Sequence, residues 1–378
     1  MLKNIAKNLI YFIILLIPFY FIRFSVAGIP TTVLEVSIYL AFVINLISGN
    51  LNGVFKLKIF KIALVFVLLS TVGIFVDPNK LSALGLFKAY FLDGLLFFAL
   101  VLSLHSREKQ TATNALVITT SVLSLILLVQ YYFGVRTADG RLLDLDKLSP
   151  NYAAMFLLPV LIISGGKIIE NYKQKFFYLY LMASALIAVC LFLTNSRGAF
   201  VSLFAGAIVL FYFYFAKSFL KKVAGYFLLL GFLILFLSTL LIFRPVFSDL
   251  GRTGSSSNIR YYIWTTSIEI IKNNPLLGIG LSNYQNYFTD FTAERINYPE
   301  FISPQALTAH NLFLHIYLSA SLFSLLAIIV LIVYNLVYSR NKIIQAALVA
   351  LIFYSMIDTT FYRNDLSILF WLILALNL

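Results

Sequence analysis

RYYIW (260–264), NPLLGIG (274–280) and HN (310–311) form three polar motifs in a chain that is otherwise mostly apolar. The 378 residues are 61% hydrophobic and only 11% charged, with a mean hydropathy of +0.94. Soluble globular proteins usually carry about 25% charged residues. We therefore expect an integral membrane protein. Polar residues that persist beside a bilayer usually have a function, so the stretch 260–311 is the first place to look for one.

The formal net charge of +13 does not indicate a nucleic-acid-binding protein, because the Lys and Arg residues are scattered between apolar runs. Contact with phospholipid headgroups or with an anionic lipid substrate accounts for them better. The 37 Phe and 23 Tyr residues are typical of lipid contact and of aromatic belts at membrane surfaces. The single cysteine, Cys190, lies inside an apolar run and cannot form an intrachain disulfide. Membrane lipids, and no nucleic acid, are therefore expected among the partners.

The apolar runs predict an all-α, polytopic bundle of transmembrane helices. A helix needs roughly 20 residues to cross about 30 Å of hydrocarbon. Twelve candidate runs are present, of which the sixth and the twelfth are short. The runs are 7–24, 30–48, 58–76, 82–104, 112–133, 149–165, 177–194, 198–216, 224–243, 309–336, 340–356 and 364–377.

Orientation follows from the basic residues, because Lys and Arg accumulate in short cytoplasmic connections. Every second connection, starting with the amino terminus, carries at least two Lys or Arg residues, whereas most of the others carry one. Both termini are therefore predicted to be cytoplasmic, with the first run retained as a signal anchor. This topology divides the chain into spans one to nine (1–243), a large extracytoplasmic loop (244–309) and spans ten to twelve (310–378).

The large outer loop is too long for a simple connection, and loops of this size usually have a function or structure of their own. Asn258 could cap a helix that stops at the NNP sequence 273–275. On that helix Arg260, Trp264 and Ile268 would share one face. We therefore predict short helices in this loop, including an amphipathic helix on the outer membrane surface.

Two short motifs resemble nucleotide-binding sequences, and both are assigned other roles. Gly278-Ile-Gly280 lacks the third glycine and the strand–helix context of a dinucleotide motif, so we expect it to let the loop approach the bundle closely. Asp144-Leu-Asp146 resembles the metal-binding pair of nucleotide-sugar enzymes. Its predicted outer location, where nucleotide sugars are absent, favours a solvated loop instead.

Two arginines are candidates for binding a diphosphate on the outer side. Arg197 lies in the short turn between two apolar runs, and Arg260 lies on the helix predicted in the large loop. A guanidinium keeps its charge and can bind phosphate oxygens through two parallel N–H donors. Alternatively, each arginine could extend from the interface to lipid headgroups. As a pair they suit a diphosphate leaving group, whose charge must be stabilised as its bond breaks.

His310 is the candidate general base among the three histidines. It precedes Asn311 at the predicted outer end of the tenth run, where the helix dipole favours a neutral imidazole that can accept a proton from a hydroxyl. A structural polar cap is the alternative interpretation. His315 lies one turn beyond Asn311 and could orient it or take the role of His310, whereas His105 is predicted on the inner side.

Glu35, Lys88 and Asp93 are charged residues that lie well inside the apolar runs, away from their ends. Such residues are costly to hold in lipid and should face the interior of the bundle. Glu35 and Lys88 could line a cavity that opens toward the arginines, and Lys88 would then contribute to substrate binding. An ion pair between them would explain both residues equally well.

Together these motifs resemble the O-antigen ligase and O-antigen polymerase (Wzy-type) superfamily of bacterial polytopic membrane proteins. The resemblance rests on TNSRGA (194–199), RYYIW (260–264), NPLLGIG (274–280) and HNLFL (310–314), in this order, around a late and large outer loop. It implies a glycosyltransferase C-like architecture. The implied reaction moves a glycan from undecaprenyl diphosphate to an acceptor hydroxyl, without a metal or another cofactor.

The resemblance also implies roles for individual residues. Arg197 and Arg260 would hold the diphosphate, and His310 would act on the acceptor as a base or an orienting group. The implied partners are an undecaprenyl diphosphate-linked glycan, a glycolipid or glycan acceptor such as lipid A-core, and other proteins of envelope glycan assembly. The implied location is the bacterial inner membrane, with the site on the periplasmic side. The expected substrate-binding residues are Arg141, Asn151, Lys88, Trp264, Asn311 and His315.

Other functions remain open at this point. A repeat-unit polymerase would share the motifs, because they do not specify the acceptor. A transporter or flippase would place polar residues at mid-membrane depth in two related halves, whereas here they gather on one predicted side. A structural envelope protein would leave the arginines and histidine without a purpose. The sequence therefore favours a ligase-like transferase.

Overall fold

The computed structural model describes residues 2–26, 29–215, 256–295 and 306–378, and within them the chain is helical apart from one antiparallel hairpin. The predicted all-α class is therefore confirmed, whereas the hairpin between α1 and α2 was not predicted. The elements are α1 (Leu2–Leu16), β1 (Arg23–Val26), β2 (Ile29–Thr32), α2 (Val33–Ile47), α3 (Lys58–Ser70), α4 (Val72–Val76), α5 (Lys80–Phe87), the π-helix η3 (Lys88–Leu92), α6 (Asp93–Leu102), α7 (Ser106–Tyr132), α8 (Pro150–Glu170), α9 (Phe177–Leu193), α10 (Arg197–Phe215), α13 (Ser256–Asn273), α14 (Tyr284–Arg295), α15 (Leu312–Ser319), α16 (Leu322–Val337), α17 (Lys342–Ser355) and α18 (Asn364–Leu376).

Several helices have the length and composition of membrane spans. In the described residues, five are long and apolar enough to cross a membrane, and six shorter apolar helices accompany them. These helices agree with a multi-pass membrane protein, while the total of twelve spans remains a prediction. The ninth predicted span, 224–243, lies outside the described residues. The five long segments are Lys58–Val76, Lys80–Leu102, Ser106–Tyr132, Pro150–Glu170 and Arg197–Phe215.

The tenth predicted span, 309–336, is wrong as a continuous helix, because it breaks into α15 and α16 at Ala320 and Ser321. Ser321 has φ = 149°, which no α-helix accommodates, and its side chain caps the new helix by accepting from Ser324 N–H. The free backbone groups at the break find partners in the large loop. Ile279 N–H donates to the Leu318 carbonyl over 2.7 Å.

The NPLLGIG segment fits into this break, which confirms the close approach predicted for its glycines. Gly278 has φ = 73°, and a Cβ at this position would lie 2.3 Å from the Leu318 carbonyl oxygen. Gly280 has φ = 107°, and a Cβ there would lie 2.5 Å from Cα of Asp77. Only glycine accepts both the backbone conformation and the lack of space. The loop therefore fixes α15 relative to the helices that surround it.

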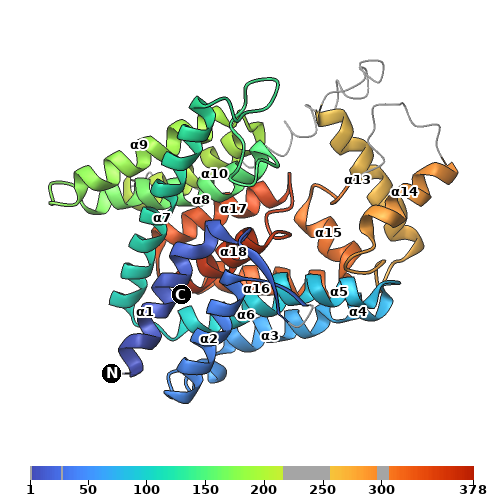
Figure 1. The fold of residues 1–378 in the computed structure, drawn as a ribbon, viewed down its shortest axis with the longest axis horizontal. Helices are drawn as coiled ribbons and strands as arrows, with labels where there is room; N and C mark the ends of the chain where they lie inside the picture. The colour runs from blue at the N-terminus through green and yellow to red at the C-terminus, as the bar shows by residue number, and fades with distance from the viewer. Residues whose placement is uncertain (1, 27–28, 216–255, 296–305) are drawn as a thin grey trace.

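The core of the bundle is built around α18, in the middle of Figure 1 together with α17. Every residue from Asp365 to Leu376 is buried, and α18 packs against α6, α17 and α8. At 13 residues it measures about 20 Å. The helix can be short because protein, and not lipid, surrounds it. Helices α7 to α10 lie on one flank of this core, and α13 and α14 lie on the other (Figure 1).

The ends of the helices and the loops between them contact one another in two separate sets. On the predicted inner side, Lys109 Nζ donates to the Ala375 carbonyl over 3.0 Å. On the predicted outer side, Asn151 Nδ2 donates to the Asp358 carboxylate over 3.2 Å. These contacts agree with the predicted alternation of inner and outer connections. Which set faces the cytoplasm remains a prediction.

Candidate functional site

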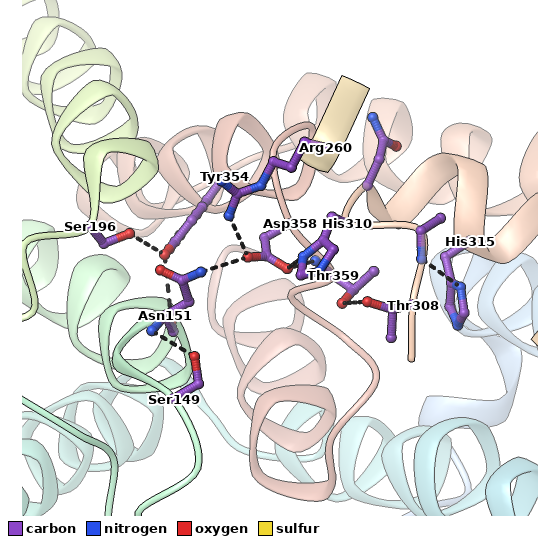
Figure 2. Close-up of polar contacts among 12 residues, drawn as sticks. Ser149, Asn151, Ser196, Arg260, Thr308, His310, His315, Tyr354, Asp358 and Thr359 are labelled. Carbon is purple, nitrogen blue, oxygen red and sulfur yellow. Dashed lines mark hydrogen bonds and ion pairs between the residues drawn. The ribbon is translucent and has the colours of Figure 1, made fainter. Parts of the chain in front are cut away.

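A buried carboxylate, Asp358, lies at the centre of a polar cluster in the loop between α17 and α18 (Figure 2). Its Oδ1 lies 3.0 Å from Nδ1 of His310, and its Oδ2 lies 3.3 Å from an Nη of Arg260. Asn151 Nδ2 donates to Oδ2 over 3.2 Å, and the Thr359 N–H donates to Oδ1 over 2.9 Å. We call Asp358, His310, Arg260 and Asn151 the Asp358 cluster.

The charges of this cluster favour an ionised Asp358. Burial alone would raise the pKa of its carboxyl, but the His310 ring and the Arg260 guanidinium outweigh that effect. They hold the pKa of Asp358 below its usual range. An ionised carboxylate only accepts hydrogen bonds. His310 therefore donates from Nδ1, which leaves Nε2 to carry the lone pair when the ring is neutral.

The backbone around His310 is held in an unusual conformation. His310 has φ = 44°, which is uncommon outside glycine, and Trp264 Nε1 donates to its carbonyl over 3.1 Å. Asn311 caps α15 by accepting from the N–H groups of Phe313 and Leu314. About 35% of the His310 side chain remains exposed, and Nε2 has no hydrogen-bond partner in the described part of the chain. These contacts leave Nε2 as the open nitrogen of an otherwise fixed ring.

Two residues predicted to bind substrate have structural contacts here. Asn311 uses its side-chain oxygen for the cap, and its Nδ2 donates to the Met356 carbonyl over 2.9 Å. Asn311 thus joins α15 to the loop that carries Asp358. Trp264 fixes the carbonyl of His310. Direct contact of either side chain with a substrate remains a prediction.

His315 differs from His310 in every respect that matters for proton transfer. It is buried in α15, which is too short to span a membrane, and its Nδ1 accepts from the Ala309 N–H over 3.3 Å. Its ring packs edge-on against Tyr284 and Tyr362. A nitrogen that accepts a hydrogen bond carries no proton, so this ring is neutral. His315 is therefore a neutral residue that supports the loop before α15.

Arg260 reaches Asp358 from α13, which packs against α15 and α14. Helix α13 ends at Asn273, as the NNP sequence predicted. Ile268 on the predicted stripe is 46% exposed, whereas Ile263 and Ile270 are buried, and contact of that stripe with the membrane surface remains a prediction. The buried face is set by packing against α14 and α15 and not by the apolar residues that follow Trp264. Arg260 and Trp264 nevertheless both reach the surroundings of His310.

Arg197 begins α10 at a tight turn that is attached to the same network. Ser196 and the hydroxyl of Tyr354 lie 2.8 Å apart, and that hydroxyl donates to the Asn151 carbonyl over 3.5 Å (Figure 2). Gly198 packs against Tyr354, where a Cβ would come within 3.0 Å of the ring. The Arg197 side chain is exposed and has no ion pair in the described residues.

The described residues show no direct contact between Arg197 and His310, two residues to which the resemblance gives roles in one reaction. Ser196, Tyr354, Asn151 and Asp358 connect them instead. Within the described residues the Arg197 guanidinium has no ion pair, so it is open to an anion.

Arg141 and Lys88 are the two remaining predicted ligands. Arg141 pairs with the exposed Asp139 over 2.7 Å, and its neighbour Leu142 donates to the Leu193 carbonyl, which brings this loop to the end of α9. Lys88 forms an ion pair with Glu35 over 2.9 Å, so the ion-pair alternative is correct for these two residues. A contact of either basic residue with substrate remains a prediction.

The same α17–α18 loop carries a second charged cluster at its other end, centred on Arg363. Its guanidinium contacts the carboxylates of Asp144 at 2.5 Å and Asp365 at 2.6 Å. It lies over the rings of Tyr152 and Tyr20, with its Cζ 4.4 and 5.1 Å from their centroids. We call these five residues the Arg363 cluster. The solvated loop predicted for Asp144 was therefore wrong, because Arg363 neutralises it and the protein buries it.

Asp358, Tyr354 and Ser196 were not recognised as site residues from the sequence. Asp358 gave a usable signal, because it is one of only 15 acidic residues and lies in a short polar connection between apolar runs. Tyr354 gave none, since it is one of 23 tyrosines in the chain. In residues 2–26, 29–215, 256–295 and 306–378 there is no group of three His, Cys, Asp or Glu side chains that could hold a metal ion.

Residues 182–325 match the family model described as O-Antigen ligase. The match covers less than half of the chain. It confirms the resemblance to the O-antigen ligase and polymerase superfamily and indicates a glycosyltransferase-like enzyme of ligase or polymerase type. Arg197, Arg260 and His310 lie inside the matched segment, whereas Asn151 and Asp358 lie outside it. No curated protein matches the chain.

Proposed function

We propose that this chain, whose segment 182–325 resembles O-Antigen ligase, transfers a glycan from undecaprenyl diphosphate to an acceptor hydroxyl. The reaction takes place at the Asp358 cluster, on the periplasmic face of the inner membrane. The acceptor is a glycolipid such as lipid A-core. The observation that carries the proposal is a histidine with one nitrogen held by a buried carboxylate and the other without a partner in the described residues, next to Arg260, which pairs with the same carboxylate.

His310 acts as the general base in this proposal. Asp358 fixes Nδ1–H, so Nε2 can remove the proton from the acceptor hydroxyl. The oxygen of that hydroxyl then forms a bond to the anomeric carbon of the glycan. The bond from that carbon to the diphosphate oxygen breaks, and its electron pair leaves with undecaprenyl diphosphate. A base in hydrogen-bond reach of the nucleophile typically accounts for about 10²–10⁴-fold in rate.

Arg197 and Arg260 stabilise the charge that develops on the leaving diphosphate. Arg197 is exposed and has no ion pair within the described residues, so it binds the diphosphate directly. Arg260 lies close to His310 through their shared partner, Asp358. This places positive charge beside both the base and the leaving group. Loss of one such donor typically costs about 10²–10³-fold in turnover.

The transfer reaction is tested with purified protein and an undecaprenyl diphosphate-linked glycan. We expect Arg197→Ala and Arg260→Ala to remain folded and to lose at least about 100-fold of the transfer rate. Arg107→Ala is the matched control, because Arg107 is exposed at the start of α7, on the predicted inner side. The proposal fails if both site variants transfer glycan at the rate of the control. We also expect transfer to continue in the presence of a metal chelator.

The acceptor distinguishes a ligase from a repeat-unit polymerase, and the shared motifs do not identify it. The glycans of a strain lacking this gene separate the two. Long glycan chains that stay on the lipid carrier identify a missing ligase, as we propose. Single repeats attached to the core identify a missing polymerase, which would correct the acceptor and retain the chemistry at His310.

A further inference from the structure

An apolar groove runs along the packed helices α3 and α16, at a distance from the Asp358 cluster. The two helices pack against each other and lie below the core in Figure 1. The groove has a volume of about 440 Å³ and is open along its length. It is lined by Lys61, Ile62, Val65, Leu69, Phe323, Leu326, Ala327 and Val330.

The walls of this groove are apolar except at one end. Val65, Leu326 and Val330 are exposed, so they would contact lipid in a membrane-spanning helix pair. Ala327 is buried between larger neighbours, and its small side chain leaves the hollow between Phe323 and Val330. The volume falls within the range of roughly 300–1,000 Å³ that is typical of ligand sites.

Lys61 supplies the polar end. Its side chain is exposed and has no ion pair or hydrogen bond within the described ranges. Lys56 and Lys58 precede it, and residues 54–70 contain no acidic side chain. A cation without a partner at the end of an apolar groove is complementary to a lipid with an anionic headgroup.

The position of Lys61 along α3 separates this groove from the proposed reaction site. The opposite end of the span formed by α3 and α4 contacts the large loop, where Leu281 N–H donates to the Gly73 carbonyl over 3.2 Å. Twelve helical residues between Lys61 and Gly73 correspond to about 18 Å. A lipid headgroup at Lys61 would therefore lie at the membrane face remote from the loop that positions α15.

We propose that the groove binds one acyl chain of an anionic phospholipid, whose headgroup phosphate pairs with Lys61. This occupant is a phospholipid of the leaflet at Lys61 and not the glycan carrier, whose diphosphate belongs near Arg197. The inference is independent of the proposed transfer reaction, because it rests on the shape of the groove and on the charge at its end.

The test measures bound lipid on the full chain by native mass spectrometry in mild detergent. Wild type is titrated with phosphatidylglycerol and with phosphatidylcholine. We expect a saturable site that phosphatidylglycerol fills at an about tenfold lower concentration. Ala327→Trp fills the groove and Lys61→Gln removes the charge, and each should reduce the bound phosphatidylglycerol at least fivefold.

Two matched variants control for general effects of the substitutions. Val122→Trp places the same side chain on the exposed face of α7, and Lys342→Gln removes an exposed lysine at the start of α17. Both should bind phosphatidylglycerol as wild type does. Equal affinity of wild type for the two lipids overturns the proposal without any variant. A polyprenyl diphosphate retained by wild type and lost in Ala327→Trp would also overturn it.

Discussion

The Asp358 cluster and the Arg363 cluster lie at opposite ends of one loop and are built with opposite charges. In the first, a single carboxylate faces a histidine and an arginine. In the second, a single guanidinium faces two carboxylates and lies over two tyrosine rings. Both central side chains are largely buried, with exposed fractions of 4% for Asp358 and 11% for Arg363. The two clusters differ in the charge and exposure of the side chains around these central residues.

That difference separates a site for chemistry from a structural clamp. His310 is about one-third exposed, and Arg260 balances the charge of Asp358, so the first cluster carries no excess of negative charge. An anionic substrate can approach such a site. The Arg363 cluster has an excess of negative charge and its carboxylates are already satisfied. It cannot hold a diphosphate, and it holds the α17–α18 loop against the segment around Asp144.

The clamp also shapes the site indirectly. Asp144 accepts from the N–H groups of Leu148 and Ser149, and Ser149 caps α8. Asn151, in the first turn of α8, then reaches Asp358. The loop after α17 is therefore joined to the segment 144–151 at two points, once in each cluster.

The largest effect should come from His310→Ala. Removal of the open nitrogen eliminates the proposed base, and we expect transfer to fall about 10²–10⁴-fold. The thermal unfolding midpoint should fall modestly, because Asp358 loses one of its two charged partners but keeps Arg260. His105→Ala is the matched control, since His105 is exposed and predicted on the inner side. If His310→Ala transferred glycan at the wild-type rate, His310 would have no catalytic role, and the Asp358 cluster would be a structural clamp like the Arg363 cluster.

Arg363→Met should have the opposite effect to His310→Ala. We expect the protein to lose stability, while the folded protein keeps its rate of glycan transfer. It leaves the buried Asp144 and Asp365 without their counter-charge, and breaking such a pair typically costs about 3–5 kcal/mol. Thermal unfolding in detergent measures the loss. Adding Asp144→Asn and Asp365→Asn should restore part of it, because the uncompensated charges are then removed. A stable Arg363→Met with a normal unfolding curve would contradict the role of a clamp.

Gly278→Ala should disturb the Asp358 cluster from a distance and leave the Arg363 cluster intact. A Cβ at Gly278 would lie 2.3 Å from the Leu318 carbonyl oxygen. Gly278 also has φ = 73°, a backbone conformation that is unfavourable for alanine. The loop and α15 must then shift, which displaces His310. We expect a destabilisation of about 1–3 kcal/mol together with reduced transfer.

Gly134→Ala is the matched control for this strain, because Gly134 has φ = 86° but no atom lies within 4 Å of its ideal Cβ. It should lose stability only through the backbone angle and keep its transfer rate. Equal losses of transfer in the two variants would show that the contact with Leu318 does not position the site.

The sequence identified candidate site residues from their type and order. Arg197, Arg260 and His310 are rare residue types in apolar surroundings, so they could be identified before the structure was known. Asp358 needed the structure, because its importance comes from the partners that converge on it from α8, α13 and the loop before α15. The break at Ser321 was equally hidden, since the flanking residues are apolar enough for one continuous helix. Distant segments decide both features, and local sequence does not record them.

The smallest effect should be a difference in pH dependence between wild type and Asp358→Asn. The folded pKa of Asp358 is lowered, so the unfolded chain, with an ordinary value of about 3.9, takes up its proton first as the pH falls. The stability that this carboxylate contributes is therefore fully present above that value and is lost as the pH falls through the lowered folded pKa. Asp358→Asn has no such contribution at any pH. Unfolding midpoints measured from pH 6 to pH 3 should show wild type above the variant at pH 6, with the gap narrowing toward pH 3. A constant gap would mean that Asp358 is not held ionised by His310 and Arg260, and the assignment of Nε2 as the open nitrogen would then lose its basis.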